Sequence, residues 1–271
     1  MRILTYTVPL EEDGRMVKGI LRGGLQLSYT LLKSLKWREN AILLNGQSVH
    51  VNAIVHAGDV VSVALSERAP REDLYCANAA KPDIVYEDDD LLVLNKPAGV
   101  AMHPKSGDAS APSLAAMLTS YLGEGSVPHF VSRLDKGTSG LLIAAKSGYV
   151  HDRLRRALHS DNLRREYRAV AVGRVEPPCG VIDAPIGRAE GSIIRRCVRA
   201  DGLPSLTEYK TLQTNDRFTL LRLRPQTGRT HQLRVHMSYL GYPLAGDWLY
   251  GTEDKALIHR PALHSYELWF T

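Results

Sequence analysis

Residues 130–147, FVSRLDKGTSGLLIAAKS, constrain the fold more than any other stretch of this 271-residue chain. Their second half, GLLIAAKS, is a short continuous apolar run of the kind that occupies the centre of a sheet. Their first half places a carboxylate, Asp135, between Arg133 and Lys136 and ahead of a Gly-Thr-Ser turn. The pattern predicts a charged loop that leads directly into a buried strand. The ordinary alternative is that Asp135 only caps a turn, as Asp before Lys-Gly often does.

The remaining patterns predict more strands than helices. Strands are expected in DIVYEDDDLLVLNKP, from Glu166 onward, in TEYKTLQT and in FTLLRLRP. Helices are expected in APSLAAMLTSYLGEG, in the basic segment after residue 148, and in HQLRVHMSYLG, with Thr230 as its cap and Gly241 at its end. The stretch from Cys179 to Leu206 is rich in Gly, Pro and Arg and predicts a hairpin or loop excursion. Without a regular βαβ rhythm, these elements favour an α+β fold with a mixed, mainly antiparallel sheet.

The first 66 residues predict a small unit of their own. A helix with Ser28 as its cap precedes alternating residues around Asn45-Gly46, which is a strong hairpin signal. A second turn is expected at residues 57–59. Residues 67–80 are polar and lack periodicity, so they predict a linker to the main domain, residues 81–271.

The charge balance suits a polyanionic partner without requiring one. Lysine and arginine number 34 against 29 aspartates and glutamates, for a formal net charge of +5. The densest basic stretch contains Arg153, Arg155, Arg156, Arg164, Arg165 and Arg168. It is either a solvated helix face or a surface that binds RNA phosphates, which gives affinity that depends on salt but little on sequence.

The cysteines and the N-terminus bear on the compartment. Cys76, Cys179 and Cys197 lie far apart and form neither a Cys-x-x-Cys pair nor a disulfide framework. The N-terminus becomes polar too early for a signal peptide, and no apolar run approaches the roughly 20 residues of a membrane span. We therefore expect a cytoplasmic protein that does not enter a membrane.

Four segments together resemble one family. SRLDKGTSGLLIAAKS is similar to the Arg-Leu-Asp and Thr-Ser-Gly signature of the RluA-type RNA pseudouridine synthases. LLVLNKPAGVAMHP, REYRAVAVGRV and LRPQTGRTHQLRVHMSYLGYPLAGDWLYG resemble the same family in the same order. The resemblance covers nearly all of residues 81–270 and implies the pseudouridine synthase fold and isomerisation of uridine in structured RNA. Residues 1–66 resemble, more loosely, the alphaL RNA-binding domain named after small-subunit ribosomal protein S-four.

The resemblance implies three catalytic residues. Asp135 matches the catalytic aspartate, Tyr167 the active-site tyrosine, and Arg234 the arginine that pairs with the aspartate. Asp135 would add to the ribose or take a proton from it as the uracil departs, and Tyr167 would help to remove the proton left on C5. A phenol is a poor base at neutral pH, so we expect a neighbour such as Arg234 to lower the pKa of Tyr167.

Substrate binding is expected of five residues, which are Arg133, Leu233, Lys96, Arg164 and Arg165. Arg133 would lie beside the target nucleotide, and Leu233 would belong to an apolar wall of the pocket. Ser132 stands where the family usually has histidine, which leaves the catalytic set intact.

No cofactor or metal is expected, because the isomerisation neither oxidises nor hydrolyses its substrate. His231 and His236 suggest zinc at first sight, but a spacing of five puts them roughly 140° apart on a helix, and no third ligand accompanies them. RNA is the expected partner, with ribosomal RNA favoured over transfer RNA, and a monomer suffices for this chemistry.

Three alternatives remain at this level. The chain could be a non-catalytic RNA-binding or ribosome-assembly protein that has kept the fold. It could be a glycoside or nucleoside hydrolase, which normally needs a second carboxylate near Asp135. Finally, Arg234 could be an ordinary surface arginine at the edge of its helix, and Tyr167 an ordinary strand tyrosine.

Overall fold

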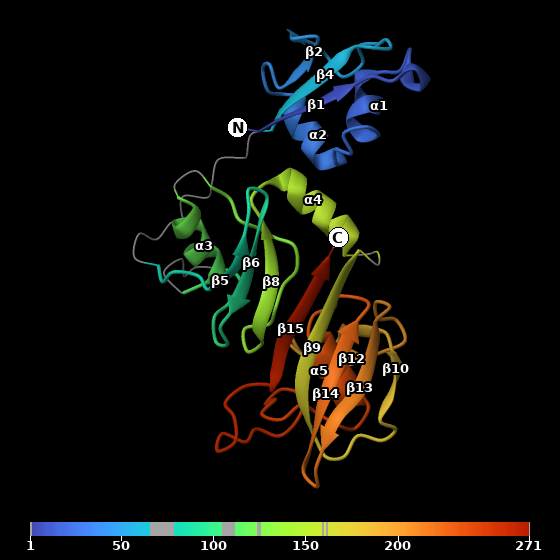
Figure 1. Cartoon of the computed structure of the whole chain (residues 1–271). Coiled ribbons are helices and arrows are strands. Elements are labelled where there is room, and N and C mark those ends of the chain that lie inside the picture. Colours follow the sequence, from blue (N-terminus) through green and yellow to red (C-terminus); the bar gives the residue numbers. More distant parts are fainter. Residues whose placement is uncertain are drawn as a thin grey trace.

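The computed structural model describes residues 2–65, 79–104, 112–123, 126–158, 160 and 162–270. Within these residues the strands form a four-stranded sheet near the N-terminus, a nine-stranded sheet, and a two-stranded sheet (Figure 1). The predicted linker, residues 67–80, lies outside the described residues except for its last two positions, as does Cys76. No helix in the described part of the chain is long and apolar enough to cross a membrane.

The N-terminal unit combines its sheet, in the order β1-β4-β2-β3, with three short helices. The strands are β1 (Arg2–Thr7), β2 (Ile42–Leu44), β3 (Gln47–Ser48) and β4 (Val60–Leu65), and the helices are η1 (Leu10–Glu12), α1 (Val17–Arg22) and α2 (Tyr29–Leu35). The Ser28 hydroxyl accepts a hydrogen bond from the Leu31 amide at 3.2 Å, as the sequence predicts for a helix cap. Asn45 and Gly46 both have positive φ, of 50° and 82°, and connect β2 to β3 as the predicted hairpin turn.

The nine-stranded sheet runs β10-β13-β14-β9-β15-β8-β6-β5, and β7 pairs with β8 beside this path. Its strands are β5 (Ile84–Glu87), β6 (Leu91–Lys96), β7 (His129–Phe130), β8 (Ser139–Ala145), β9 (Leu163–Val172), β10 (Cys179–Asp183), β13 (Leu206–Thr214), β14 (Phe218–Pro225) and β15 (Leu263–Phe270). The β15–β8 pair is parallel, whereas the other recorded pairs are antiparallel. The predicted α+β fold with a mixed, mainly antiparallel sheet is confirmed.

The C-terminal strand β15, which the sequence patterns do not predict, joins the two halves of this sheet. It pairs with β9 along most of its length but with β8 only through His264 and Ser265. Beyond that point β8 pairs instead with β7, through Ala144 and Ala145. The chain between β7 and β8, which contains Asp135, therefore lies where the two halves of the sheet separate.

Helices cover both faces of the β6–β8 half. α3 (Leu114–Leu122) joins the core around Leu92 and Leu94, and α4 (Gly148–Ala157) joins the core around Leu91 and Val93. Successive residues of a strand face opposite sides, so a strand covered on both sides reads as an unbroken apolar run. The serines before α3 and α4 cap them through hydrogen bonds of 3.2 Å.

The N-terminal unit packs against α4. Its buried residues belong to the same apolar cluster as the buried residues of α4 and as Leu91 and Val93 of β6. Arg156, on α4, donates a hydrogen bond to the carbonyl of Gln26 at 2.6 Å. Figure 1 shows α4 between the N-terminal unit and the nine-stranded sheet.

Two local predictions need correction. The last helix, α5 (Gln232–Tyr239), follows His231, whose φ of 59° lies in the left-handed region, and Thr230 does not cap it. The strand expected from Glu166 begins earlier, at Leu163. The preceding helix ends at Ala157, which leaves room for the three additional strand residues. The stretch from Cys179 to Leu206 contains β10 and a two-stranded sheet of β11 (Ile186–Arg188) and β12 (Arg196–Val198).

Candidate active site

A cavity of about 700 Å³ opens where β8 and β15 separate. Its size falls within the about 300–1,000 Å³ of typical small-molecule sites. The β7–β8 loop, β9 and the chain leading into α5 contribute the residues that line it. The structure brings six of the eight predicted site residues into this one pocket, which are Arg133, Asp135, Arg165, Tyr167, Leu233 and Arg234.

The loop that carries Asp135 is held by a turn and by a close approach of two strands. The Thr138 amide donates to the Asp135 carbonyl at 3.0 Å. Gly140 then adopts a φ of 107°, and a Cβ there would lie 2.1 Å from the Ser265 carbonyl oxygen. Only glycine allows β8 to meet β15 at this position, which explains the glycine of the Thr-Ser-Gly sequence.

Lys96 lies beneath this loop and does not reach the cavity. Its side chain is fully buried, and its ammonium donates to the carbonyls of Pro97, Val100 and Lys136 at 2.8, 2.9 and 3.3 Å. Burial lowers the pKa of Lys96 to about 8, and the negative charge of Asp135 partly opposes this. Lys96 is therefore not among the residues that line the cavity, and its donors tie the Lys-Pro-Ala-Gly loop to the Asp135 loop.

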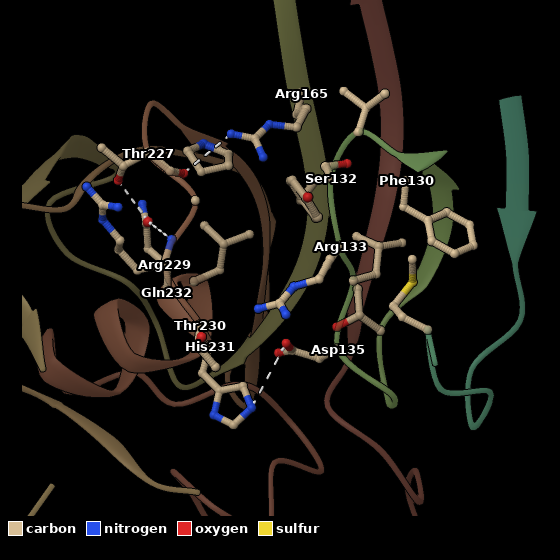
Figure 2. Close-up of a pocket in the computed structure, with 18 of the residues that line it drawn as sticks. Phe130, Ser132, Arg133, Asp135, Arg165, Thr227, Arg229, Thr230, His231 and Gln232 are labelled. Carbon is tan, nitrogen blue, oxygen red and sulfur yellow. Dashed lines mark hydrogen bonds and ion pairs between the residues drawn. The ribbon is translucent and has the colours of Figure 1, made fainter. Parts of the chain in front are cut away.

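Asp135 is approached by one basic group at each carboxylate oxygen. Its Oδ2 lies 3.4 Å from Nη1 of Arg234, and its Oδ1 lies 4.0 Å from Nε2 of His231. The predicted contact between Asp135 and Arg234 is therefore present. Figure 2 shows the side chains of Arg133, Asp135 and His231 directed toward one another within the pocket.

The main partner of Arg234 is another carboxylate, Asp247. Nε and Nη2 of Arg234 donate to the two oxygens of Asp247 at 2.7 and 2.8 Å, and Asp247 is fully buried. Burial opposes the charge of Arg234, but the hydrogen bonds to Asp247 outweigh it and raise its pKa. Arg234 is only 5% exposed, so the alternative of a surface arginine is wrong. Asp247 is not among the residues predicted from the sequence, although it lies in the segment GDWLYG that resembles the family.

Tyr167 lies on β9 and is almost completely buried. Burial raises the pKa of its phenol, while Arg165 and a hydrogen bond with Ser265 act in the opposite direction. The expectation that Arg234 lowers this pKa is wrong, since Arg165 is the nearby cation and burial dominates. At neutral pH the side chain is a neutral phenol, which can donate a hydrogen bond but is a poor base.

The alternation of β9 separates the two neighbouring arginines. Arg165 and Tyr167 line the cavity, and Nη2 of Arg165 donates to the Thr227 carbonyl at 3.4 Å. Arg164 points to the other face of the sheet, where its guanidinium lies 5.2 Å from the centre of the Trp269 ring. The structure therefore supports Arg165 as a residue of the substrate pocket and not Arg164.

The other arginines of the basic stretch have different surroundings. Arg155 lines the cavity. Arg153 lies over the Tyr149 ring, and Arg156 bonds to the N-terminal unit. Arg168, on the outer face of β9, forms an ion pair with Glu166, which is buried. The predicted basic surface is thus divided among a pocket wall, packing contacts and an ion pair with a buried carboxylate.

The charge of the cavity discriminates among the candidate reactions. Six lysine and arginine residues line it, which are Arg133, Lys136, Arg155, Arg165, Arg229 and Arg234. Among the described residues of its wall, Asp135 is the only carboxylate. A glycoside hydrolase uses a pair of carboxylates at the scissile bond. The arrangement instead fits a single carboxylate acting on a polyanionic substrate.

The two histidines of the last helix do not converge on a common site. His236 is buried, with Nδ1 against the Thr207 hydroxyl and Nε2 against the Ala184 carbonyl, each at 2.9 Å. His231 lies in the pocket wall, with Nδ1 at 2.8 Å from the Tyr250 hydroxyl. Both ring nitrogens of His236 are thus engaged by protein oxygens.

Known proteins are similar to this chain in sequence and in fold. The family model described as RNA pseudouridylate synthase matches residues 90–239. A ribosomal large subunit pseudouridine synthase D of Vibrio parahaemolyticus is 42% identical over 254 residues, which cover 92% of this chain and 77% of that protein. The uncharacterized RNA pseudouridine synthase YjbO of Bacillus subtilis is 39% identical over 250 residues, which cover 92% of this chain and 88% of that protein.

The solved structure of human RNA pseudouridylate synthase domain containing 1 has a TM-score of 0.58 and 28% identity. The match covers 74% of this chain and 80% of the human chain. The fold, the pocket and the matched sequence thus lead to one assignment. This chain belongs to the RNA pseudouridylate synthase family and is an RNA pseudouridine synthase.

Proposed function

We propose that this enzyme converts uridine to pseudouridine in large-subunit ribosomal RNA, with Asp135 as the catalytic residue. The observation that carries the role of Asp135 is its place as the only carboxylate among the described residues of a cavity with six basic residues. The choice of RNA rests on the name of the Vibrio relative. Transfer RNA remains the alternative substrate.

The reaction breaks the bond between N1 of uracil and C1′ of ribose, turns the uracil, and joins C5 to C1′. A uridine stacked in RNA cannot reach Asp135, so it must first be flipped into the pocket, which costs a few kcal/mol. Asp135 then adds to the ribose or takes a proton from it as the uracil leaves. Arg234 provides positive charge at 3.4 Å from the carboxylate throughout.

The other pocket residues bind the nucleotide and exclude water. Arg133 is exposed at the cavity and is placed to contact the target nucleotide or its phosphate. Leu233 is buried in the pocket wall, where it helps to keep water from a freed intermediate. Arg165 adds positive charge on the β9 side. Because Tyr167 is a neutral phenol, we assign it a hydrogen-bonding role at the uracil or at a water molecule that takes the C5 proton.

We assign residues 1–66 to RNA binding as an alphaL-like domain and residues 81–271 to catalysis. The separate four-stranded sheet of the first part supports this division. The hydrogen bond from Arg156 to Gln26 fixes the N-terminal unit beside the helix whose Arg155 lines the cavity. We expect the enzyme to act as a monomer in the cytoplasm.

The test is a map of pseudouridine in all RNAs of source cells that lack the gene. The cells are complemented with the wild-type protein, with Asp135→Asn, or with the control Asp216→Asn, which changes an exposed carboxylate in the β13–β14 turn. We expect sites in large-subunit ribosomal RNA to vanish and to return with the wild type and the control only. Sites restored by Asp135→Asn would refute the role of Asp135, and sites confined to transfer RNA would replace the proposed substrate.

A further inference from the structure

We propose that His231 is a positioning residue that holds the second oxygen of the Asp135 carboxylate, and that Tyr250 fixes the orientation of its ring. The inference rests on the proposed function, because it concerns the same carboxylate. Arg234 approaches Oδ2 of Asp135, and Nε2 of His231 approaches Oδ1 at 4.0 Å (Figure 2). With one group at each oxygen, rotation of the carboxylate about the Cβ–Cγ bond of Asp135 is restricted.

The hydrogen bonds of Tyr250 determine which nitrogen of His231 carries the proton. The Tyr250 hydroxyl accepts from the backbone amide of Arg196 at 2.9 Å. Its own proton is then free to be donated, and Nδ1 of His231 lies 2.8 Å away. A neutral imidazole has one donor nitrogen and one acceptor nitrogen. We infer that Nδ1 accepts the Tyr250 proton and that the proton of the ring lies on Nε2, the nitrogen that faces Asp135.

The same tyrosine orients both groups that approach Asp135. The Tyr250 ring meets the His231 ring edge-on, with centroids 5.6 Å apart and planes at 77°. The guanidinium of Arg234 lies over the Tyr250 ring at 5.0 Å from its centroid. Tyr250 is itself buried, and its backbone amide donates to the Asp247 carboxylate at 3.3 Å. One ordered side chain thus places both neighbours of the catalytic carboxylate.

The backbone of His231 is held in an unfavourable conformation. Its φ of 59° and ψ of 17° lie in the left-handed region, which residues other than glycine seldom adopt. Strain of this kind is retained where the surrounding structure needs the side chain in one place. Here the left-handed conformation of His231 lets the chain enter α5 while the imidazole turns toward Asp135 and Tyr250.

The charge state of His231 agrees with a donor role through Nε2. Burial lowers its pKa, and the positive charges of Arg234 and Arg196 act in the same direction, while Asp135 and Asp247 oppose them. At neutral pH the ring is therefore neutral. The 4.0 Å gap exceeds hydrogen-bond length, but catalytic hydrogen bonds are often long before the substrate binds and shorten in the complex.

The test measures turnover of large-subunit ribosomal RNA carrying tritium at C5 of uridine, because the reaction releases that hydrogen. We expect His231→Ala to lower kcat about 10- to 100-fold, as for a misplaced catalytic group, with KM changed by no more than about twofold. His231→Gln offers an amide donor near the place of Nε2 and should recover part of the loss. Tyr239→Phe, which removes an exposed hydroxyl from α5, serves as the matched control for Tyr250→Phe.

A double-mutant cycle separates positioning from general destabilisation. If Tyr250 acts through His231, Tyr250→Phe lowers kcat in the wild-type background but changes it little in His231→Ala. A kcat of His231→Ala equal to that of the wild type would overturn the inference. So would a double variant, His231→Ala with Tyr250→Phe, whose loss in kcat equals the product of the two single losses. If His231→Ala fails to fold, the comparison of Tyr250→Phe and His231→Gln with wild type decides it. An inactive wild type beside an inactive Asp135→Asn would instead refute the proposed function.

Discussion

Replacing Asp247 with asparagine removes the negative charge that balances a buried guanidinium. In the wild type Asp247 accepts two hydrogen bonds from Arg234, at 2.7 and 2.8 Å, and both side chains are almost completely shielded from solvent. An amide keeps one acceptor oxygen and places an NH₂ group against the guanidinium in place of the other. Breaking a buried ion pair on one side costs about 3–5 kcal/mol. We expect Asp247→Asn to lower the free energy of unfolding by that amount.

The same substitution should impair catalysis. Without Asp247, the nearest carboxylate to Arg234 is that of Asp135, at 3.4 Å. A closer pair between these two would draw Asp135 away from the ribose, and a misplacement of about 1 Å costs about 100-fold in rate. Urea unfolding gives the stability, and tritium release from RNA labelled at C5 of uridine gives kcat. Asp216→Asn, an exposed carboxylate, is the control in both assays.

The two readouts test different parts of the reasoning. A normal free energy of unfolding would show that Arg234 does not depend on Asp247 for its charge balance. A loss of stability with wild-type kcat would show that Arg234 does not pull on Asp135 when its other partner is removed. Either result would refute the argument that Arg234 is shared between two carboxylates.

Two further predictions concern Arg165 and Lys96. Arg165→Gln should weaken RNA binding and reduce the slope of log binding constant against log salt concentration by about one. Arg164→Gln, on the other face of β9, should leave the affinity and the slope unchanged. Filter binding over a range of salt concentrations checks this, and equal effects of the two variants would contradict it. Burial lowers the pKa of Lys96 to about 8 from its ordinary 10.5, so between these values the unfolded chain binds a proton that the folded chain has lost. The contribution of Lys96 to the free energy of unfolding should therefore rise with pH across this window and disappear in Lys96→Met. Urea unfolding of both proteins from pH 7 to 10 checks this. The same dependence of the free energy of unfolding on pH in wild type and in Lys96→Met would contradict it.

Features set by neighbouring residues could be predicted from the sequence. The Ser28 cap, the Asn45-Gly46 hairpin and the buried strand after Asp135 each depend on a few adjacent residues. The separation of Arg164 from Arg165 also follows from strand alternation, since Arg165 and Tyr167 are two residues apart and share a face. Net charge alone, in contrast, groups the arginines of the basic stretch on one surface, because charge carries no information on which face of the strand each side chain occupies.

Features set by distant residues could not be predicted from local patterns. Lys96 follows an apolar strand and resembles an exposed loop lysine, because its acceptors are carbonyls of Pro97, Val100 and Lys136 that only the folded loops bring together. Asp247 and Tyr250 lie in a polar and aromatic stretch whose residues have no period that marks them as partners of Arg234 and His231. The spacing of His231 from His236 suggests only a metal ligand, whereas its contacts with Asp135 and Tyr250 form through the fold.

The distances around Arg234 suggest why the enzyme needs a second carboxylate that never meets the substrate. If Asp135 were the sole counter-ion of this buried guanidinium, each movement of Asp135 toward the ribose would leave a buried charge unpaired, which costs several kcal/mol. The bidentate contact with Asp247, at 2.7 and 2.8 Å, supplies the balance, so the contact with Asp135 can remain longer, at 3.4 Å. Asp135 is thereby kept beside a fixed positive charge without being bound tightly by it. The proposed role of Asp135, in which its carboxylate acts on the ribose and later separates from it, requires that combination.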